Sequence, residues 1–403
     1  MTLRRDWLKS VARGGAAAVA GAWGIDVRAQ QATSPRPASR TVQRPALEAW
    51  ESRPPVDRQA ADMLEAIRAR HRLPGMLGAI VKGDAVIATA ATGVRRIDAP
   101  GEIRITDLIH LGSCTKAMTA TLLGTLYEQG AVSPDATLAG VFPEYADRLH
   151  PDYRAVTLAQ LTSHRAGLPK DVDWWRLPGR TPTEKRYALL QETCAAPPRT
   201  RPGTSYTYSN VGYVLAGLMA EQVTGMGWEE LIRERVFQPL RMYSAGFGPP
   251  GAGRSEPGEQ PYGHHLVDGR VESIRHDNPE VMGPAGTVHC TMLDWAKFAS
   301  AHLRGERRGA KLLQPSTYRI LHTPAPGEAY AGGWMAVDRD WAGGRALSHT
   351  GSNTMWYATI WLAPARDFGM LVATNQGGGT TDQACDEGVG ALLQRYEAAY
   401  ARG

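Results

Sequence analysis

Cysteine is scarce in this chain of 403 residues, and its placement excludes several classes of protein. Its four cysteines are Cys114, Cys194, Cys290 and Cys385. They form no Cys-x-x-Cys pair and no His-Cys spacing of the kind that binds zinc. A small disulfide-stapled scaffold and a cysteine-based metal site are therefore excluded. One or two disulfides stay open if the protein is exported, and the sequence does not pair the cysteines.

The body of the chain also lacks an excess of charge of either sign. The formal net charge is +5, but residues 1–29 carry a net +3 and residues 30–58 a net +2. From residue 59 onward the positive and negative charges therefore balance. The basic pI belongs to the N-terminal segment and does not indicate nucleic-acid binding.

Long apolar runs are missing after the N-terminus, so we predict no stable membrane insertion of the mature protein. The chain begins with two adjacent arginines, an aromatic residue, Leu and Lys, followed by a mildly apolar stretch and a small-residue site ending at Ala29. This pattern resembles a twin-arginine export signal. We expect residues 1–29 to be that signal, 30–56 a Pro/Ser/Arg-rich tail and 57–403 the folded domain. The expected location is the periplasm or the outside of the cell.

Hydrophobic periodicity predicts helices and strands at both ends of the domain. A helical period covers 56–70, and a hairpin with a Gly83-Asp84 turn covers 78–90. The strands and the helix expected near the C-terminus are 333–337, 345–350, 356–362, 368–374 and 381–400. We therefore predict an α+β fold, in which one antiparallel sheet is flanked by the N- and C-terminal helices. A mostly helical inserted lobe covers about 107–330, and a ligand site is expected between the two parts.

A serine and a lysine open the apolar helix that we expect to end near Gly130. Ser113 and Lys116 are three residues apart, so their side chains share one face of the first helical turn. An amine with a lowered pKa could accept the serine proton there, and the alkoxide could attack a carbonyl. A capping serine followed by a solvated lysine is the alternative. We interpret the adjacent Cys114 as a small apolar residue rather than as the nucleophile.

Two further clusters follow in the chain. Tyr208-Ser209-Asn210 precedes an apolar helix over 211–223, and His349-Thr350-Gly351 lies on the strand before Trp356. Ser-x-x-Lys followed by Ser-Asp-Asn and Lys-Thr-Gly is the signature of serine penicillin-recognising enzymes. In order and spacing, the three clusters resemble the class C β-lactamase and DD-peptidase family of serine hydrolases, which also includes esterases.

Three other segments resemble landmarks of the same family. They are LTSHRAGLP at 161–169, FQPLRM at 237–242 and PAGTVHCTMLD at 284–294. The matches run in order from about 58 to 398. The resemblance implies a β-lactamase/DD-peptidase-like fold that uses no cofactor and no metal.

The residue types fit acyl transfer, which needs a nucleophile, a base, a proton donor for the leaving group and N–H groups for the oxyanion. We assign Ser113 as the nucleophile and Lys116 with Tyr208 as the basic pair. A lysine ammonium beside a tyrosine favours the phenolate, and which of the two holds the proton at rest stays open. Asn210 is expected to face the same way as Tyr208 and to bond a substrate amide.

The resemblance assigns the oxyanion hole to the backbone N–H groups of Ser113 and Ser352. It also implies that Thr350 and Gly351 shape the strand on which the substrate lies. His349 stands where many relatives carry lysine, although some DD-peptidases of the family have the same His-Thr-Gly. Because histidine is mostly neutral at pH 7, efficient β-lactam hydrolysis is less expected, while carboxylate-bearing substrates are not excluded.

Three hypotheses follow for a protein whose partner is a small-molecule or peptide substrate. The first is a peptidase or amidase, DD-carboxypeptidase-like or β-lactamase-like, that works through an acyl-serine. The second is an esterase with the same residues, and the third is an inactive binding protein. No Gly-x-Ser-x-Gly elbow is present, and His264-His265 lacks the neighbours of a zinc hydrolase. We interpret His164 as structural and leave Trp174 and Trp175 as either pocket walls or packing residues.

Overall fold

The computed structural model describes residues 55–252 and 260–401. The predicted export signal over 1–29, and nearly all of the predicted tail, lie outside these ranges, so both stay predictions. No helix within the described ranges is both long and apolar enough to span a bilayer.

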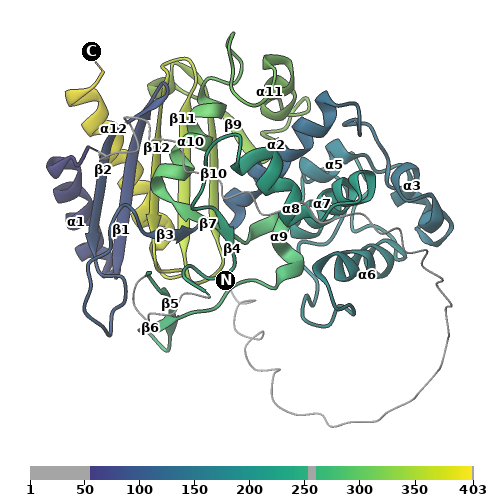
Figure 1. Cartoon of the computed structure of the whole chain (residues 1–403), viewed down its shortest axis with the longest axis horizontal. Coiled ribbons are helices and arrows are strands. Elements are labelled where there is room, and N and C mark those ends of the chain that lie inside the picture. Colours follow the sequence, from purple (N-terminus) through teal and green to yellow (C-terminus); the bar gives the residue numbers. More distant parts are fainter. Residues whose placement is uncertain (1–54, 253–259, 402–403) are drawn as a thin grey trace, which may run out of the picture. The chain divides into compact units, whose positions relative to one another are not determined.

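The two ends of the domain meet in one antiparallel sheet, as predicted. Figure 1 shows the purple N-terminal hairpin beside the yellow C-terminal strands. The strand order is β2-β1-β12-β11-β10-β9-β8, and β1 pairs with β12 from Met76 to Lys82. The strands are β1 (Gly75–Lys82), β2 (Ala85–Gly93), β8 (Tyr330–Ala331), β9 (Trp334–Arg339), β10 (Gly344–Ser352), β11 (Tyr357–Ala363) and β12 (Phe368–Thr374).

Helices cover both faces of this sheet. On one face, α1 (Arg58–His71) packs against α12 (Thr381–Ala399), and on the other lies α10 (Met292–Leu303). Successive strand residues therefore enter different cores: Met76 packs with the helices α1 and α12, and Leu77 with α10. This explains why β12 is buried at every position and reads as a continuous apolar run.

The segment between β2 and β8 contains far more helix than strand, and the mixed helix and antiparallel sheet confirm the predicted fold class. Its helices other than α10 are α2 (Thr115–Glu128), α3 (Leu138–Val141), α4 (Pro151–Arg154), α5 (Leu158–Thr162), α6 (Pro182–Cys194), α7 (Asn210–Thr224), α8 (Trp228–Ile232), α9 (Gly283–Gly286) and α11 (Pro315–His322). The segment also contains two small sheets that were not predicted. One has the order β3-β7-β4, and the other is the β5-β6 hairpin. Their strands are β3 (Leu108–His110), β4 (Gly246–Phe247), β5 (Gly263–Val267), β6 (Arg270–Ile274) and β7 (Val288–Thr291).

Helix α2 contains the longest run of continuously buried residues among the helices of this segment. Every residue from Thr115 to Leu126 is buried, because the helix packs against α7, α8, α9 and α11. Lys116 is buried with them, since it lies in the first turn of a helix that has no solvent-facing side there.

All four cysteines are free and buried, so the disulfides left open above are not formed. Cys114 packs with its Sγ 3.7 Å from the carbonyl oxygen of His349. Burial also raises the pKa of its thiol, which disfavours the reactive thiolate. Both observations agree with its interpretation as a small apolar residue.

Candidate active site

Ser113 lies in a short 3₁₀ turn, Gly112–Cys114, that leads into α2 and presses against the end of β10. Gly112 has a φ of +49°, and a Cβ there would lie 2.4 Å from the backbone nitrogen of Ser352. A Cβ at Gly351 would lie 2.0 Å from the carbonyl oxygen of Leu111 and 2.7 Å from the nitrogen of Ser113. Two glycines therefore allow backbone to approach backbone, and the backbone nitrogens of Ser113 and Ser352 lie near one another.

Two other predicted residues, Tyr208 and Lys116, both contact the hydroxyl of Ser113. Tyr208 donates its O–H to Ser113 Oγ at 2.6 Å, and Lys116 Nζ lies 3.2 Å from the same oxygen. The three residues come from the 3₁₀ turn, from α2 and from the segment before α7. A nucleophile, an amine and a phenol are therefore in hydrogen-bond contact.

Lys116 is fully buried and has two further partners. Its Nζ donates to Asn210 Oδ1 and to the carbonyl oxygen of Ala285, each at 2.7 Å. Burial lowers the pKa of Lys116 to about 7, with the carboxylate of Asp171 acting in the opposite direction. Within the described residues no carboxylate pairs directly with this amine. A substantial fraction of neutral amine is therefore present near pH 7.

Burial favours the protonated form of Tyr208, a point that the sequence left open. Burial raises the pKa of Tyr208 above its ordinary value of 10, and the hydrogen bond to Ser113 offsets only part of that rise. The ammonium that should have favoured the phenolate is itself disfavoured by the same burial. At rest, the described geometry therefore fits a neutral Lys116 beside a neutral Tyr208.

Asn210 is the first residue of α7, and its side chain belongs to the site. The N-cap of α7 is Ser209, whose side chain accepts from the N–H of Gly212 at 3.0 Å. The side chain of Asn210 is thereby left to bridge Lys116 and Asp171, donating from Nδ2 to Asp171 Oδ1 at 2.7 Å.

Asp171 was missed by the sequence analysis. It also accepts from Trp174 Nε1 at 3.2 Å. Its position two residues after the landmark at 161–169 was the available signal, although a single loop aspartate has no periodic pattern. Trp174 is buried, whereas Trp175 is exposed and stacks on His276 with ring centroids 5.8 Å apart. The first therefore packs, and the second lies at the surface.

His164 positions Tyr208, in agreement with its structural interpretation. Its ring centroid lies 4.4 Å from that of Tyr208, and its Nδ1 accepts from the N–H of Ser209 at 3.1 Å. Burial holds the pKa of His164 well below its ordinary range, so the ring is neutral and adds no charge to the site.

His349 is neutral and faces the protein interior. Its Nδ1 lies 2.6 Å from the carbonyl oxygen of Thr350, so Nδ1 carries the proton, and Nε2 accepts from Tyr330 O–H at 2.8 Å. Burial lowers the pKa of His349 to about 3. The His-Thr-Gly segment therefore presents no positive charge.

The remaining predicted residues reach the site differently. Thr350 and Ser352 are exposed and alternate with the buried His349 and Gly351 along β10. Ser352 and Gly351 approach Ser113 through their backbone. Among the described residues, the side chains of His349 and Thr350 make no hydrogen bond to Ser113, Lys116 or Tyr208. The same part of the chain contains no group of three or more His, Cys, Asp or Glu side chains that could hold a metal ion.

Comparison with known proteins places this geometry in context. A sequence model of the family described as Beta-lactamase matches residues 60–394. Penicillin-binding protein 4 of Amycolatopsis lactamdurans is 25% identical over 335 residues, covering 79% of this chain and 85% of that protein. Unguisins hydrolase ungD' of Aspergillus campestris is 25% identical over 346 residues, covering 80% of this chain and 62% of that protein. The crystal structure of D-alanine carboxypeptidase AmpC from Burkholderia cenocepacia matches with a TM-score of 0.68 at 20% identity, covering 84% of this chain and 98% of that one.

Proposed function

The chain belongs to the beta-lactamase family of serine hydrolases, and from this premise we propose that Ser113 forms an acyl-enzyme with an amide, β-lactam or D-alanyl peptide substrate. The family match extends over most of the described chain. A penicillin-binding protein and a D-alanine carboxypeptidase are among the similar proteins, which supports this substrate class.

The observation that carries the proposal is the hydrogen bonding of Lys116. A neutral amine has two N–H groups and one lone pair. Asn210 Oδ1 and the carbonyl oxygen of Ala285 accept two N–H groups, and Nζ lies 3.2 Å from Ser113 Oγ. Once the amine is neutral, its lone pair is therefore available to the O–H of Ser113. Lys116 can then take the serine proton as Oγ attacks the substrate carbonyl.

Tyr208 supplies the second proton transfer. When the bond to the leaving group breaks, the phenol O–H protonates the departing nitrogen or oxygen, and the nearby ammonium of Lys116 stabilises the phenolate that results. In the second half of the reaction, the phenolate takes a proton from the attacking water. Ser113 Oγ then leaves the acyl group and recovers its proton from Lys116, which returns both bases to their starting state.

The negative charge on the carbonyl oxygen develops beside the backbone nitrogens of Ser113 and Ser352. The close approach at Gly112 and Gly351 brings these two nitrogens together. Two backbone donors held in place before the reaction stabilise an oxyanion without reorganisation, and loss of one such donor costs about 10²–10³ in rate.

An esterase is the second candidate, and the neutral His349 favours it. A lysine at this position would offer a charge to a substrate carboxylate, whereas the imidazole is buried and bonded to Tyr330. Simple esters carry no carboxylate that would need such a partner. The two candidates share one mechanism and differ only in the group that binds beside β10.

The test is covalent labelling of the mature protein with a fluorescent penicillin and with a fluorophosphonate. We expect Ser113→Ala to abolish both labels while circular dichroism shows a folded protein. Cys114→Ala is the matched control and should keep both labels. Labelling that persists in Ser113→Ala would contradict the assignment, and a wild-type protein that takes neither label would favour the inactive binding protein.

A second measurement separates peptidase from esterase. The values of kcat/KM are compared for nitrocefin, a D-Ala-D-Ala peptide and short-chain p-nitrophenyl esters. The first proposal expects the peptide or nitrocefin to lead, and a large preference for the esters would overturn it in favour of the second candidate.

A further inference from the structure

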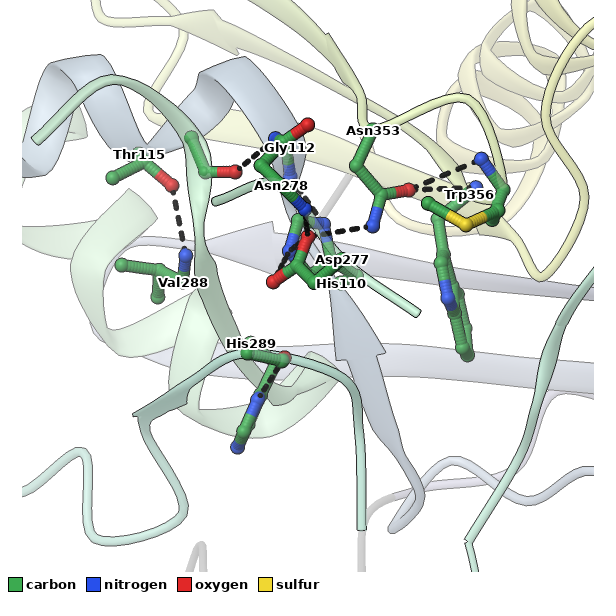
Figure 2. Close-up of polar contacts among 12 residues, drawn as sticks. His110, Gly112, Thr115, Asp277, Asn278, Val288, His289, Asn353 and Trp356 are labelled. Atoms are coloured by element: carbon green, nitrogen blue, oxygen red, sulfur yellow. Dashed lines mark hydrogen bonds and ion pairs between the residues drawn. The ribbon is translucent and has the colours of Figure 1, made fainter. Parts of the chain in front are cut away.

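A buried polar network contacts Gly112, the residue before Ser113 (Figure 2). His110, the last residue of β3, is fully buried, and its Nδ1 accepts from the N–H of Gly112 at 3.0 Å. Since that nitrogen accepts, the ring proton is on Nε2, which donates to the carboxylate of Asp277 at 2.9 Å. The residue before the nucleophile is thus tied to a buried aspartate through one imidazole.

Asp277 also holds the segment that follows Ser352. Asn353 donates from Nδ2 to Asp277 Oδ1 at 2.9 Å. The other side-chain atom, Asn353 Oδ1, accepts from the N–H groups of Met355 and Trp356, at 3.2 and 3.0 Å. Asn353 is 2% exposed and is bound on both ends of its amide, so it has one conformation available.

Asn278, the residue after Asp277, contacts a third part of the site, helix α9. Asn278 donates from its backbone N–H to Asp277 Oδ1 at 2.6 Å and from Nδ2 to the carbonyl oxygen of Gly286 at 2.8 Å. Gly286 follows Ala285, whose carbonyl accepts from Lys116. The loop between β6 and α9 therefore bonds His110, which holds the turn of Ser113, and Asn353 after β10, and also Gly286, the residue after the acceptor of the catalytic amine.

We propose that Asp277 is a positioning residue that sets the spacing between the N–H groups of Ser113 and Ser352 through His110 and Asn353. The inference rests on the proposed function, because it assigns these N–H groups to the oxyanion. Gly112 and Asn353 are each one residue from a donor, and they come from distant parts of the sequence. One carboxylate bonded to both partners holds the two halves of the oxyanion hole together. A displacement of about 1 Å in such a site can cost about 10²-fold in rate.

The substitution Asp277→Asn tests this connection at nearly constant volume. The carboxylate accepts from three N–H donors, whereas an asparagine offers one oxygen and presents its own N–H groups to the rest. Asp294→Asn is the matched control. Asp294 is also buried and also accepts from a backbone N–H, that of Ser244 at 2.7 Å, but it pairs with Lys297 away from the site.

The readout is the inhibition constant of a phenylboronic acid, whose tetrahedral adduct on Ser113 places an oxygen in the oxyanion hole. It is compared with kcat/KM and KM for a p-nitrophenyl ester, and active sites are counted with a fluorophosphonate. We expect Asp277→Asn to weaken boronate binding and to lower kcat/KM by a similar factor of about 10–100, with KM changed less than threefold. Asp294→Asn should leave these constants unchanged at an equal loss of thermal stability.

A structural role alone would lower the melting temperature and the count of active sites without changing the boronate constant per site, and that result would overturn the inference. Asn353→Ala in the Asp277→Asn background adds a check, because residues of one network are not additive. The double variant should be no slower than the slower single variant. If wild type takes no fluorophosphonate at Ser113, the proposed function fails instead, and the two failures are thereby distinguished.

Discussion

Two fully buried cations near opposite ends of helix α7 show how partners decide what burial does. Arg186 contacts Glu221 and also Glu229, the latter at 2.5 Å. Burial alone would lower its pKa, but the two carboxylates raise the pKa of Arg186 above its ordinary value. Lys116 instead has Asn210 and a backbone carbonyl as acceptors, and burial lowers its pKa to about 7.

The difference separates a structural cation from a reactive one. A buried cation with carboxylate partners keeps its charge and joins three elements, here α6, α7 and α8. A buried amine whose acceptors are neutral loses its charge easily and can serve as a base. The same helix thus contributes Glu221 to stability and Asn210 to the site.

The largest effect is expected from replacing the reactive cation. Lys116→Met should lower kcat/KM by about 10³-fold or more, because Ser113 loses its base. The folded-state pKa of about 7 lies below the ordinary lysine value of 10.5, so at pH 7 the unfolded chain binds this proton more readily and Lys116 reduces stability. Lys116→Met should therefore keep or raise the melting temperature, as measured by differential scanning fluorimetry. A variant that keeps more than a tenth of the wild-type rate would contradict the role of the base.

The opposite pattern is expected at the structural cation. Arg186→Met leaves the buried carboxylate of Glu221 and the half-buried carboxylate of Glu229 without their partner, so the free energy of unfolding should fall by about 3–5 kcal/mol. Urea denaturation measures this loss, and kcat/KM per folded molecule should change only a few-fold. Adding Glu221→Gln should recover part of the stability. The comparison breaks down if Arg186→Met loses activity as completely as Lys116→Met while staying equally stable.

The pH dependence of kcat/KM tests the role of Lys116 as the base, with a smaller expected effect. With an uncharged ester, kcat/KM should rise with pH through an apparent pKa near 7, because only the neutral amine of Lys116 accepts the serine proton. No fall is expected up to about pH 9, since burial raises the pKa of Tyr208 above 10. A profile that is flat between pH 5.5 and 8.5 would remove Lys116 as the titrating group.

The smallest effect is expected from Asp171→Asn, which should shift the apparent pKa in the pH dependence of kcat/KM. The carboxylate raises the pKa of Lys116, so its neutralisation should move the apparent pKa below the wild-type value and increase relative activity near pH 6. Asparagine keeps an oxygen for Asn210 Nδ2, so the geometry is retained. Asp173→Asn, an exposed change in the same loop, is the control and should leave the profile unmoved. An upward shift in Asp171→Asn would contradict the assigned sign.

Six strands of the main sheet could be predicted because they are long enough to show an apolar pattern, whereas the two-residue β8 was not predicted. The seven residues of β12 are all buried, and β1 has the same character, so both stand out in the sequence. The sheet of β3, β7 and β4 could not be predicted, because its strands have only two to four residues. So short an apolar run has no period by which a strand differs from a loop.

The residues of the site also differ in whether the sequence could predict them. Ser113, Lys116, Tyr208 and Asn210 were predicted, because their spacing matches a motif in which residue type and order carry the information. Asp277 was not, because a lone polar residue in a loop gives no signal until its distant partners are known.

The sequence by itself therefore determined which chemical groups are present and in what order: a hydroxyl, an amine, a phenol and the glycines that let two backbones meet. Only the tertiary structure decided where the protons lie. Lys116 is neutral enough to be a base, Tyr208 keeps its proton, and His349 carries no charge. The physical reason is that a pKa depends on burial and on partners far away in the chain, which no local pattern records.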